Sequence, residues 1–592
     1  MNSATKVCQN CKREFSIEPE DFSFYEKINV PPPTFCPFCR FARRFSYRNE
    51  RNLFWNKSAK SGKKILSLYP LQSHVTVYDE DEWFRDDWDA LEYGRDYDFS
   101  KPFFEQFHEL ARTVPRHARS NTSGNTANVA SDYVANTGWS RNCYFIFNAS
   151  GNENCAYGNG VDDCRECFDC SNSIKCELSY ESFLNRNCYK THFSSQCEEC
   201  MNVWFSKDCI GCTDCFGCIN LRNKKFYIFN IPYSKEEYRE KLKNMELHKW
   251  SGLKVAREKT RDFWLKNPVK YMRGINNINS TGDYIDHSRN VHLGYIVRES
   301  ENVRYCQYLS VPSIKDCMDV TLDGWGSNNE LCYENSISGL GISNSRFSAE
   351  CWPEVRDTEY SMFCKNVSNV FGCVGLKNKQ YCVFNKQYSK NDYKELTGRI
   401  KKHMDDMPYT DKNGNIYRYG EFFPIEHSPF GYNISAISEH YPLSKEQALD
   451  RGYAWNEPES KEYDITMKSE DIPDSINDIA DDILSGVIAC VNCARAYRII
   501  KMELDFLRAE NIPLPRLCPD CRHKMRIAQR NPYFFYNGEC GCAGGSSSNG
   551  KYKNSTPHFH REKVCPSKFI TSYAPDRPEI VYCEQCYQAE VV

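Results

Sequence analysis

The sequence predicts a mainly β protein: a Cys-rich β-solenoid in two blocks, with helical caps, flanked by a small cysteine-knuckle unit near each end of the chain. Three observations predict this fold. Cysteines recur at a fixed interval in the middle of the chain, paired Cys-x2-Cys motifs stand near both ends, and the short apolar segments between turn residues have no helical periodicity. The 592 residues are too many for a single core, so several structural units are expected.

Composition excludes several classes of protein. The 76 Lys and Arg residues against 79 Asp and Glu give a net charge of −3, which excludes a uniformly basic histone-like binder but allows a local basic patch. The mean hydropathy is −0.68, and no apolar run approaches the roughly 18 residues of a membrane helix, so we expect no membrane contact. The first residues lack an apolar signal segment, which predicts a cytoplasmic location. In that reducing compartment the 33 cysteines are expected to be thiols and metal thiolates rather than disulfides.

Two cysteine tetrads with the same spacing lie near the two ends. In each, two Cys-x2-Cys motifs enclose a segment of the same length (12–35 and 494–517), and the second motif has the form Cys-Pro-x-Cys-Arg. Each motif puts two sulfurs on one tight turn, so two motifs complete a tetrahedral shell of four thiolates. A closed shell leaves no position for a catalytic water, which predicts structural zinc in a zinc-ribbon or treble-clef-like unit. The predicted ligands are Cys8, Cys11, Cys36 and Cys39 in the first unit and Cys490, Cys493, Cys518 and Cys521 in the second.

A third metal site is expected after the second tetrad. Cys583 and Cys586 form another knuckle, and Cys565 is the nearest upstream partner. We favour Cys542 as the fourth ligand. The competing candidates for that position are Cys540, His558 and His560. The chain is therefore expected to bind two to three Zn²⁺ ions.

The cysteines in the middle are predicted to be a structural repeat. Four of them recur at a constant interval of 21: Cys155, Cys176, Cys197 and Cys218. A fixed period of about 20 residues is typical of a solenoid, so we predict coils of about 21 residues with thiols stacked inside as small apolar groups. An iron–sulfur site is the main alternative, but the ferredoxin run ends with a three-residue gap and a proline, whereas Cys218 follows a two-residue gap and precedes Ile219. Zinc storage or mixed metal binding by these cysteines also remains open.

A second solenoid block is predicted because residues 370–393 align with residues 215–238 at a constant offset of 155. In both copies a serine, Ser234 or Ser389, stands where a helix N-cap is expected, so each block should end in a helical lid. We expect the aromatic side chains of 79–110 to pack on the first block. The predicted units are zinc-binding unit 1 (1–69), a connecting segment (70–130), solenoid block 1 (131–233), a helical cap and linker (234–272), solenoid block 2 (273–386), a second cap (387–403), a linker with a short helix starting at Ser444 (404–482), and a C-terminal zinc-binding unit with one or two sites (483–592).

Each tetrad is followed by a basic segment. Cationic side chains interleaved with aromatic ones beside a zinc knuckle are typical of contact with phosphate and bases, so RNA or DNA is the first predicted partner. The alternative is a structural role, because zinc with four thiolates carries a charge of about −2 that nearby cations offset. The candidate nucleic-acid-binding residues are Arg40, Arg43, Arg44, Arg48 and Arg51 in the first unit and Arg522, Lys524, Arg526 and Arg530 in the second.

Five segments of the chain carry a resemblance to a known family: CPFCRFARRFSYRNERNLF, ALEYGRDYDFSKPFFEQF, FGCINLRNKKFYIFN, CPDCRHKMRIAQRNP and SYAPDRPEIVYCEQCY. In these segments, and over nearly its whole length, the chain resembles an uncharacterised family of cysteine-rich, zinc-ribbon domain-containing proteins of candidate-phylum bacteria. The resemblance implies metal binding and an intracellular location, and it implies no activity.

Three functions follow as hypotheses. The first is a non-enzymatic zinc-binding protein that contacts RNA or DNA through the basic segments and uses the solenoid as a docking surface. The second is a protein–protein interaction scaffold with purely structural zinc, in which a partner binds the solenoid face. The third is a carbohydrate-active enzyme of the β-helix type, which is disfavoured because no catalytic constellation stands out in the sequence. The sequence leaves the oligomeric state open.

Overall fold

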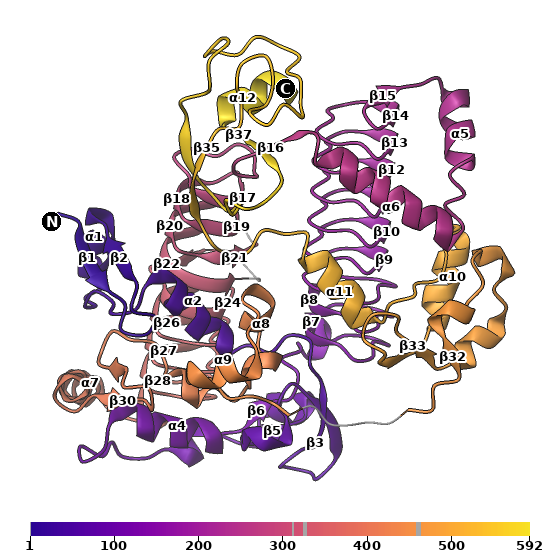
Figure 1. Cartoon of the computed structure of the whole chain (residues 1–592). Coiled ribbons are helices and arrows are strands. Elements are labelled where there is room, and N and C mark those ends of the chain that lie inside the picture. The colour runs from indigo at the N-terminus through magenta and orange to yellow at the C-terminus, as the bar shows by residue number, and fades with distance from the viewer. Residues whose placement is uncertain (1, 311–312, 324–327, 458–462, 592) are drawn as a thin grey trace.

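Two β-solenoids stand side by side in the computed structural model, which describes residues 2–310, 313–323, 328–457 and 463–591 (Figure 1). The chain climbs the first solenoid, crosses over and descends the second, so the mainly β fold with two solenoid blocks is confirmed. The strands of the first are β7 (Ala135–Gly138), β8 (Phe147–Ser150), β9 (Arg165–Phe168), β10 (Glu177–Tyr180), β11 (Tyr189–His192), β12 (Met201–Trp204), β13 (Thr213–Phe216) and β14 (Lys225–Ile228). Those of the second are β17 (Gly282–Asp286), β18 (Arg289–His292), β19 (Gly294–Arg298), β20 (Ser300–Arg304), β21 (Gln307–Leu309), β22 (Ile314–Asp323), β23 (Asn329–Glu330), β24 (Tyr333–Ser338), β25 (Ile342–Arg346), β26 (Val355–Glu359), β27 (Val367–Phe371) and β28 (Gln380–Val383).

The coil of the first solenoid is shorter than the sequence predicted, so the expected length of about 21 is wrong. The parallel ladder pairs Glu177 with Tyr189 and Tyr189 with Met201, which sets the repeat at 12. Every third residue from Ala130 to Phe229 has a positive φ, which turns the chain at a corner. Each coil therefore has four sides of three residues. Asparagine, aspartate and glycine occupy many of these corners because they tolerate the left-handed region best.

The three-residue side explains the misleading interval of 21. All thirteen cysteines from Cys143 to Cys218 are separated by multiples of three, so they occupy the same position on different sides. An interval of 21 joins thiols on adjacent sides, because it equals two coils less one side. The true vertical stacks have an interval of 12, and the longest is Cys164, Cys176, Cys188, Cys200 and Cys212.

The predicted interior column of cysteines is confirmed, and the thiols have internal hydrogen-bond partners. The Sγ of Cys155 donates to the carbonyl oxygen of Cys164 at 3.4 Å, and Cys167 donates in the same way to Cys176 at 3.3 Å. In the second solenoid, burial raises the pKa of the Cys382 thiol to about 12, so it stays protonated. A narrow coil needs a small side chain at each inward position, and a neutral thiol is both small and able to donate to a carbonyl.

Each solenoid ends in the predicted helical lid. The final strands β14 and β28 turn back into the short antiparallel strands β15 (Ile231–Pro232) and β29 (Lys386–Gln387). The helices α5 (Lys235–Lys243) and α7 (Lys390–Asp406) follow. The hydroxyl of Ser234 accepts from the backbone N–H of Glu237, and Ser389 caps α7 in the same way. The lids pack on the last strand of each solenoid, which would otherwise offer an unpaired edge to another chain.

Each terminal unit packs on the solenoid that is farther from it in the sequence. The N-terminal unit comprises β1 (Ala4–Val7), β2 (Glu14–Ile17), α1 (Pro19–Lys27) and α2 (Pro37–Ser46), and it packs on the second solenoid (Figure 1). The corresponding C-terminal unit comprises β33 (Ile488–Ala489), β34 (Ala496–Tyr497), α10 (Lys501–Ala509) and α11 (Pro519–Ile527), and it packs on the first. A last unit of β35 (Tyr536–Glu539), β36 (Lys568–Thr571), β37 (Ile580–Tyr582) and α12 (Glu584–Val591) follows at the end of the chain.

The connecting segment also packs on the second solenoid, so the expectation that it covers the first is wrong. Its helix α4 (Phe103–Thr113) places Phe103 5.6 Å from Phe371 and Phe104 5.7 Å from Tyr360, measured between ring centroids. Aromatic side chains repeat along this face of the solenoid from coil to coil, and α4 excludes water from them.

Two further connections complete the chain. The helix α6 (Trp250–Trp264) and strand β16 (Pro268–Lys270) join the solenoids, and β16 pairs with β37 of the last unit. In the predicted linker 404–482, the helices α8 (Ile437–His440) and α9 (Lys445–Asp450) pack against the core, and Ser444 caps α9 as predicted. Residues 458–462 of that linker lie outside the described residues. Among the described residues, no helix combines the length and the apolar character needed to cross a bilayer.

Candidate metal centres and the helices they position

The N-terminal tetrad is assembled as predicted. The sulfurs of Cys8, Cys11, Cys36 and Cys39 all lie within 4.8 Å of one another. Cys36 is the N-cap of α2, and its backbone N–H donates to the Sγ of Cys8 at 3.2 Å. The side-chain amide of Asn10 donates to the Sγ of Cys39 at 3.4 Å. Such N–H donors stabilise thiolate charge, so this group could hold a metal ion.

The C-terminal tetrad repeats this geometry with the same internal spacing. The sulfurs of Cys490, Cys493, Cys518 and Cys521 again lie within 4.8 Å of one another. The N–H of Cys518 donates to the Sγ of Cys490 at 3.3 Å, and Asn492 donates to the Sγ of Cys521 at 3.4 Å. Cys518 is the N-cap of α11, as Cys36 is of α2. In both units a candidate metal ligand is therefore the residue at which a helix begins.

The third tetrad consists of Cys540, Cys565, Cys583 and Cys586, so our preference for Cys542 was wrong. The N–H of Cys583 donates to the Sγ of Cys540 at 3.2 Å, which is the same contact that joins the two knuckles of the other tetrads. Cys542 lies instead with His558, His560 and Cys586. Cys540 and Cys542 flank a single glycine, and nothing in their sequence context distinguishes them. Only the position of Cys540 opposite the turn at Cys583 decides between them.

Among the described residues, these are the groups of cysteine, histidine or carboxylate side chains placed to hold a metal, and all lie outside the solenoid cores. Every cysteine of the solenoids is buried. The thiols therefore separate into metal-competent clusters in the terminal units and core side chains in the solenoids.

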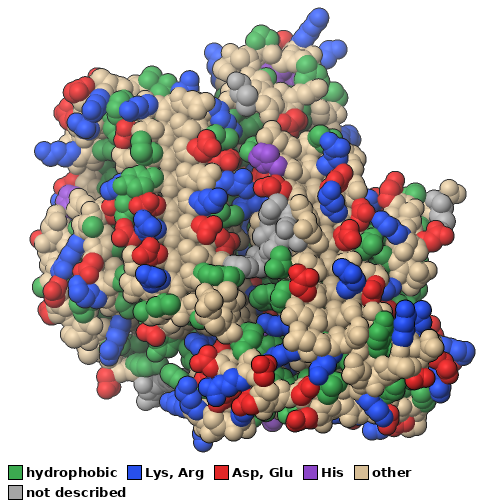
Figure 2. Space-filling model, turned by 180° about the vertical axis from the view of Figure 1, so that it is seen from behind, with side chains coloured by type: hydrophobic (Ala, Val, Ile, Leu, Met, Phe, Trp, Pro, Cys, Tyr) green, Lys and Arg blue, Asp and Glu red, His purple; other side chains and the backbone are tan. Residues whose placement is uncertain are grey.

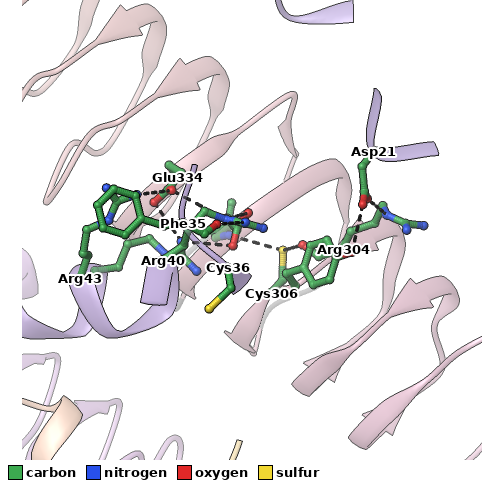
Figure 3. A network of polar contacts seen from close by, with 12 residues as sticks. Asp21, Phe35, Cys36, Arg40, Arg43, Arg304, Cys306 and Glu334 are labelled. Carbon is green, nitrogen blue, oxygen red and sulfur yellow. Dashed lines mark hydrogen bonds and ion pairs between the residues drawn. The ribbon is translucent and has the colours of Figure 1, made fainter. Parts of the chain in front are cut away.

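The basic residues of α2 are directed into the second solenoid (Figure 3). The Nε of Arg40 lies 2.8 Å from a carboxylate oxygen of Asp319, and a guanidinium nitrogen of Arg44 lies 3.2 Å from the other oxygen. Arg43 contacts Glu334 on the next coil at 2.9 Å. The side chains of all three arginines are at most 1% exposed. The carboxylates of the solenoid therefore occupy the positions that a phosphate would take.

The helix α11 makes the equivalent contact with the first solenoid. Arg522 and Arg526 each lie 2.6 Å from one oxygen of Asp169. Asp169 and Asp319 are both corner residues with positive φ, at 54° and 55°. One corner aspartate of each solenoid therefore receives two arginines from the helix that a cysteine tetrad begins. Below, α2 and α11 are called the docking helices.

These buried ion pairs compensate their own desolvation only while both partners are present. Burial raises the pKa of the Asp319 carboxyl to about 6, while Arg40 and Arg44 act in the opposite direction. Burial likewise opposes the charge of Arg43, but Glu334 and Glu421 together hold its pKa above the ordinary value. A buried pair of this kind contributes little net stability. Removal of one partner is nevertheless strongly destabilising, because it leaves an unpaired charge in the core.

Three of the four remaining predicted basic residues, Arg48, Arg51 and Arg530, join the two solenoids or the units packed on them. Arg48 donates to Asn148 of the first solenoid and, at 2.9 Å, to Glu350 of the second. Arg51 lies 3.5 Å from Asp520 at the start of α11. Arg530 is buried and donates to the Tyr308 hydroxyl at 2.7 Å. Lys524, in contrast, is exposed.

The predicted nucleic-acid contacts are therefore corrected for eight of the nine residues. Eight of the nine residues are buried against internal partners and cannot reach a phosphate backbone: Arg40, Arg43, Arg44, Arg48, Arg51, Arg522, Arg526 and Arg530. The alternative structural role fits their positions, although most of their acidic partners are carboxylates of the solenoids and of neighbouring segments rather than zinc-bound thiolates. The signal for these contacts in the sequence is the presence of acidic residues at the solenoid corners.

A polar cleft of about 700 Å³ lies between the first solenoid and the beginning of the second. Cationic and acidic side chains alternate on its walls, as the view from behind shows (Figure 2). Its lining includes Arg186, Glu198 and Arg222 from the first solenoid and Tyr271, Arg273 and Arg298 from the segment 270–298.

Comparisons with known proteins add no family. A scan against models of protein families and a search of curated proteins each found no match. The resemblance to the zinc-ribbon family therefore remains a prediction.

Proposed function

We propose that the protein is a non-enzymatic binding scaffold in which zinc has a purely structural role. One observation carries this proposal: each docking helix directs its arginines to a corner aspartate of a solenoid, Asp319 or Asp169. Each unit that carries a tetrad is thereby fastened to one solenoid, and Arg48 contacts both solenoids. The cleft between them is the surface that this arrangement leaves to a partner.

Zinc is the metal that the ligand sets favour. Four thiolates from two knuckles form the closed tetrahedral shell of structural zinc sites, and the closed shell leaves no place for a reacting water. Iron can also occupy a site of four thiolates, so metal analysis of the purified chain is required. We expect zinc and no iron-type absorption.

A protein is the partner class that we favour over RNA or DNA. Binding to nucleic acid depends on a continuous set of accessible cations, and only Lys524 of the nine predicted residues is exposed. The walls of the cleft carry both signs of charge, with Arg186 3.8 Å from Glu198. Mixed charges of this kind suit a protein surface of complementary pattern and would repel a polyanion at the acidic positions.

Photo-crosslinking tests the proposal. A photoreactive amino acid at Arg186, in the cleft, should capture a specific protein from the native host, whereas the same residue at Arg165 should not. Arg165 is a matched control because it belongs to the same solenoid, does not line the cleft, and has 59% of its side chain exposed. Equal capture at both positions would contradict a binding cleft. Capture of RNA or DNA at Arg186 would replace the scaffold by the nucleic-acid function.

A further inference from the structure

The last unit holds a second cluster of metal-ligand side chains beside the third tetrad. Cys542, His558, His560 and Cys586 each present a ligand atom, and these atoms lie within 4.8 Å of one another. Both cysteines are fully buried, and His558 is 5% exposed. Cys586 belongs to this cluster and to the third tetrad at once.

The hydrogen bonds of His558 leave one ring nitrogen free to bind a metal. Its Nε2 lies 2.8 Å from a carboxylate oxygen of Glu590. A carboxylate only accepts at neutral pH, so Nε2 carries the proton and Nδ1 has a lone pair. That Nδ1 lies 3.4 Å from the Sγ of Cys542. A carboxylate behind the histidine is the usual support of a metal-bound imidazole.

His560 is oriented in the same way. Its Nδ1 lies 2.6 Å from the carbonyl oxygen of Lys563, which can only accept, so the lone pair is on Nε2. That Nε2 lies 3.3 Å from the Sγ of Cys586. The amide of Asn554 donates to the Sγ of Cys542 at 3.2 Å, which repeats the amide-to-sulfur contact of the first two tetrads. Two lone pairs and two sulfurs therefore converge on one point.

We propose that the last unit binds two zinc ions, with the thiolate of Cys586 as a bridge between them. The first ion is held by Cys540, Cys565, Cys583 and Cys586. The second is held by Cys542, His558 Nδ1, His560 Nε2 and Cys586. Both shells are closed and tetrahedral, so both ions are structural.

Charge supports the pair. A single Zn²⁺ beside five thiolates would leave a net charge of −3, whereas two ions leave −1. The second ion also ties the loop 543–564 to α12, because both histidines lie in that loop and Cys586 lies in the helix. The four candidates for the fourth ligand of the third site, Cys540, Cys542, His558 and His560, thus all have a place in the binuclear site.

Metal counting tests the proposal on the intact chain. Elemental analysis of protein purified without added metal should give four zinc ions per chain: one in each of the first two tetrads and two in the last unit. His558→Gln should reduce the count to three, and the exposed His287→Gln should leave it at four. Cys542→Ser should also lose one ion. Cys170→Ser should lose none, because serine already occupies the equivalent position of later coils at Ser182 and Ser194.

The bridge has its own measurement, which needs no variant. In the wild-type chain loaded with ¹¹³Cd, two of the four resonances should show scalar coupling to each other through the sulfur of Cys586. Four uncoupled resonances would overturn the bridge. Three zinc ions in the wild type, unchanged by His558→Gln, would overturn the second ion while leaving the scaffold function intact.

Discussion

Asp169→Asn and Asp319→Asn are each expected to lower the stability of the solenoid that carries them by about 3–5 kcal/mol, the usual effect of removing one partner from a buried ion pair. Each substitution leaves two guanidinium groups in the core with one carboxylate fewer. An asparagine keeps the volume and tolerates the corner conformation, so the effect is that of lost charge. Urea unfolding measures the change in global stability, and native-state hydrogen exchange measures the change at the affected coil.

Asp163→Asn is the matched control. Asp163 is also a corner residue with positive φ, at 52°, but it is exposed. Its substitution should change the stability by no more than about 0.5 kcal/mol. Equal losses of stability at Asp163 and Asp169 would mean that the ion pairs with arginine do not stabilise the solenoid. The role assigned to the docking helices would then be wrong.

Removal of a metal ligand from one terminal unit is expected to destabilise the solenoid that is farther from that unit in the sequence. Cys39→Ser should release one metal ion and unfold the N-terminal unit, because structural zinc contributes about 10–16 kcal/mol of apparent binding free energy to small units of this kind. The larger loss of hydrogen-exchange protection should then appear at β22 and β24 of the second solenoid, where α2 packs.

Cys521→Ser provides the reciprocal experiment. It should release the metal of the C-terminal unit and expose β9 and β10 of the first solenoid, near Asp169 and Tyr180, which Arg526 and Arg522 contact. Cys39→Ser should therefore reduce hydrogen-exchange protection mainly in the second solenoid, and Cys521→Ser mainly in the first. If each substitution instead affected the solenoid nearer to it in sequence, the crosswise arrangement would be contradicted.

The sequence predicted the chemistry of the cysteines better than the geometry of the coil. The first two tetrads could be recognised because their spacing alone brings four sulfurs together, and the same motif occurs twice. The coil length could not be derived from the intervals between cysteines. Any multiple of three keeps a residue on the inner face, so Cys155 and Cys176 share a phase without stacking. The recurrence of corner residues at every third position was the better signal.

The role of the arginines depended on contacts that are distant in sequence. Arg40 and Asp319 are 279 residues apart, and Arg526 and Asp169 are 357 apart. A basic segment beside a zinc knuckle has the same local sequence whether its partner is a phosphate or a buried carboxylate. The choice between the two was set by tertiary packing, which local patterns do not contain.

Anomalous X-ray diffraction at the zinc absorption edge tests whether the cysteines are divided between terminal metal clusters and solenoid cores. We expect anomalous peaks only among the terminal cysteine clusters. The electron-density map of the same crystals should place Arg40 and Arg44 on Asp319, and Arg522 and Arg526 on Asp169. Peaks along the cysteine columns of either solenoid, or docking helices whose arginines face solvent, would contradict these expectations.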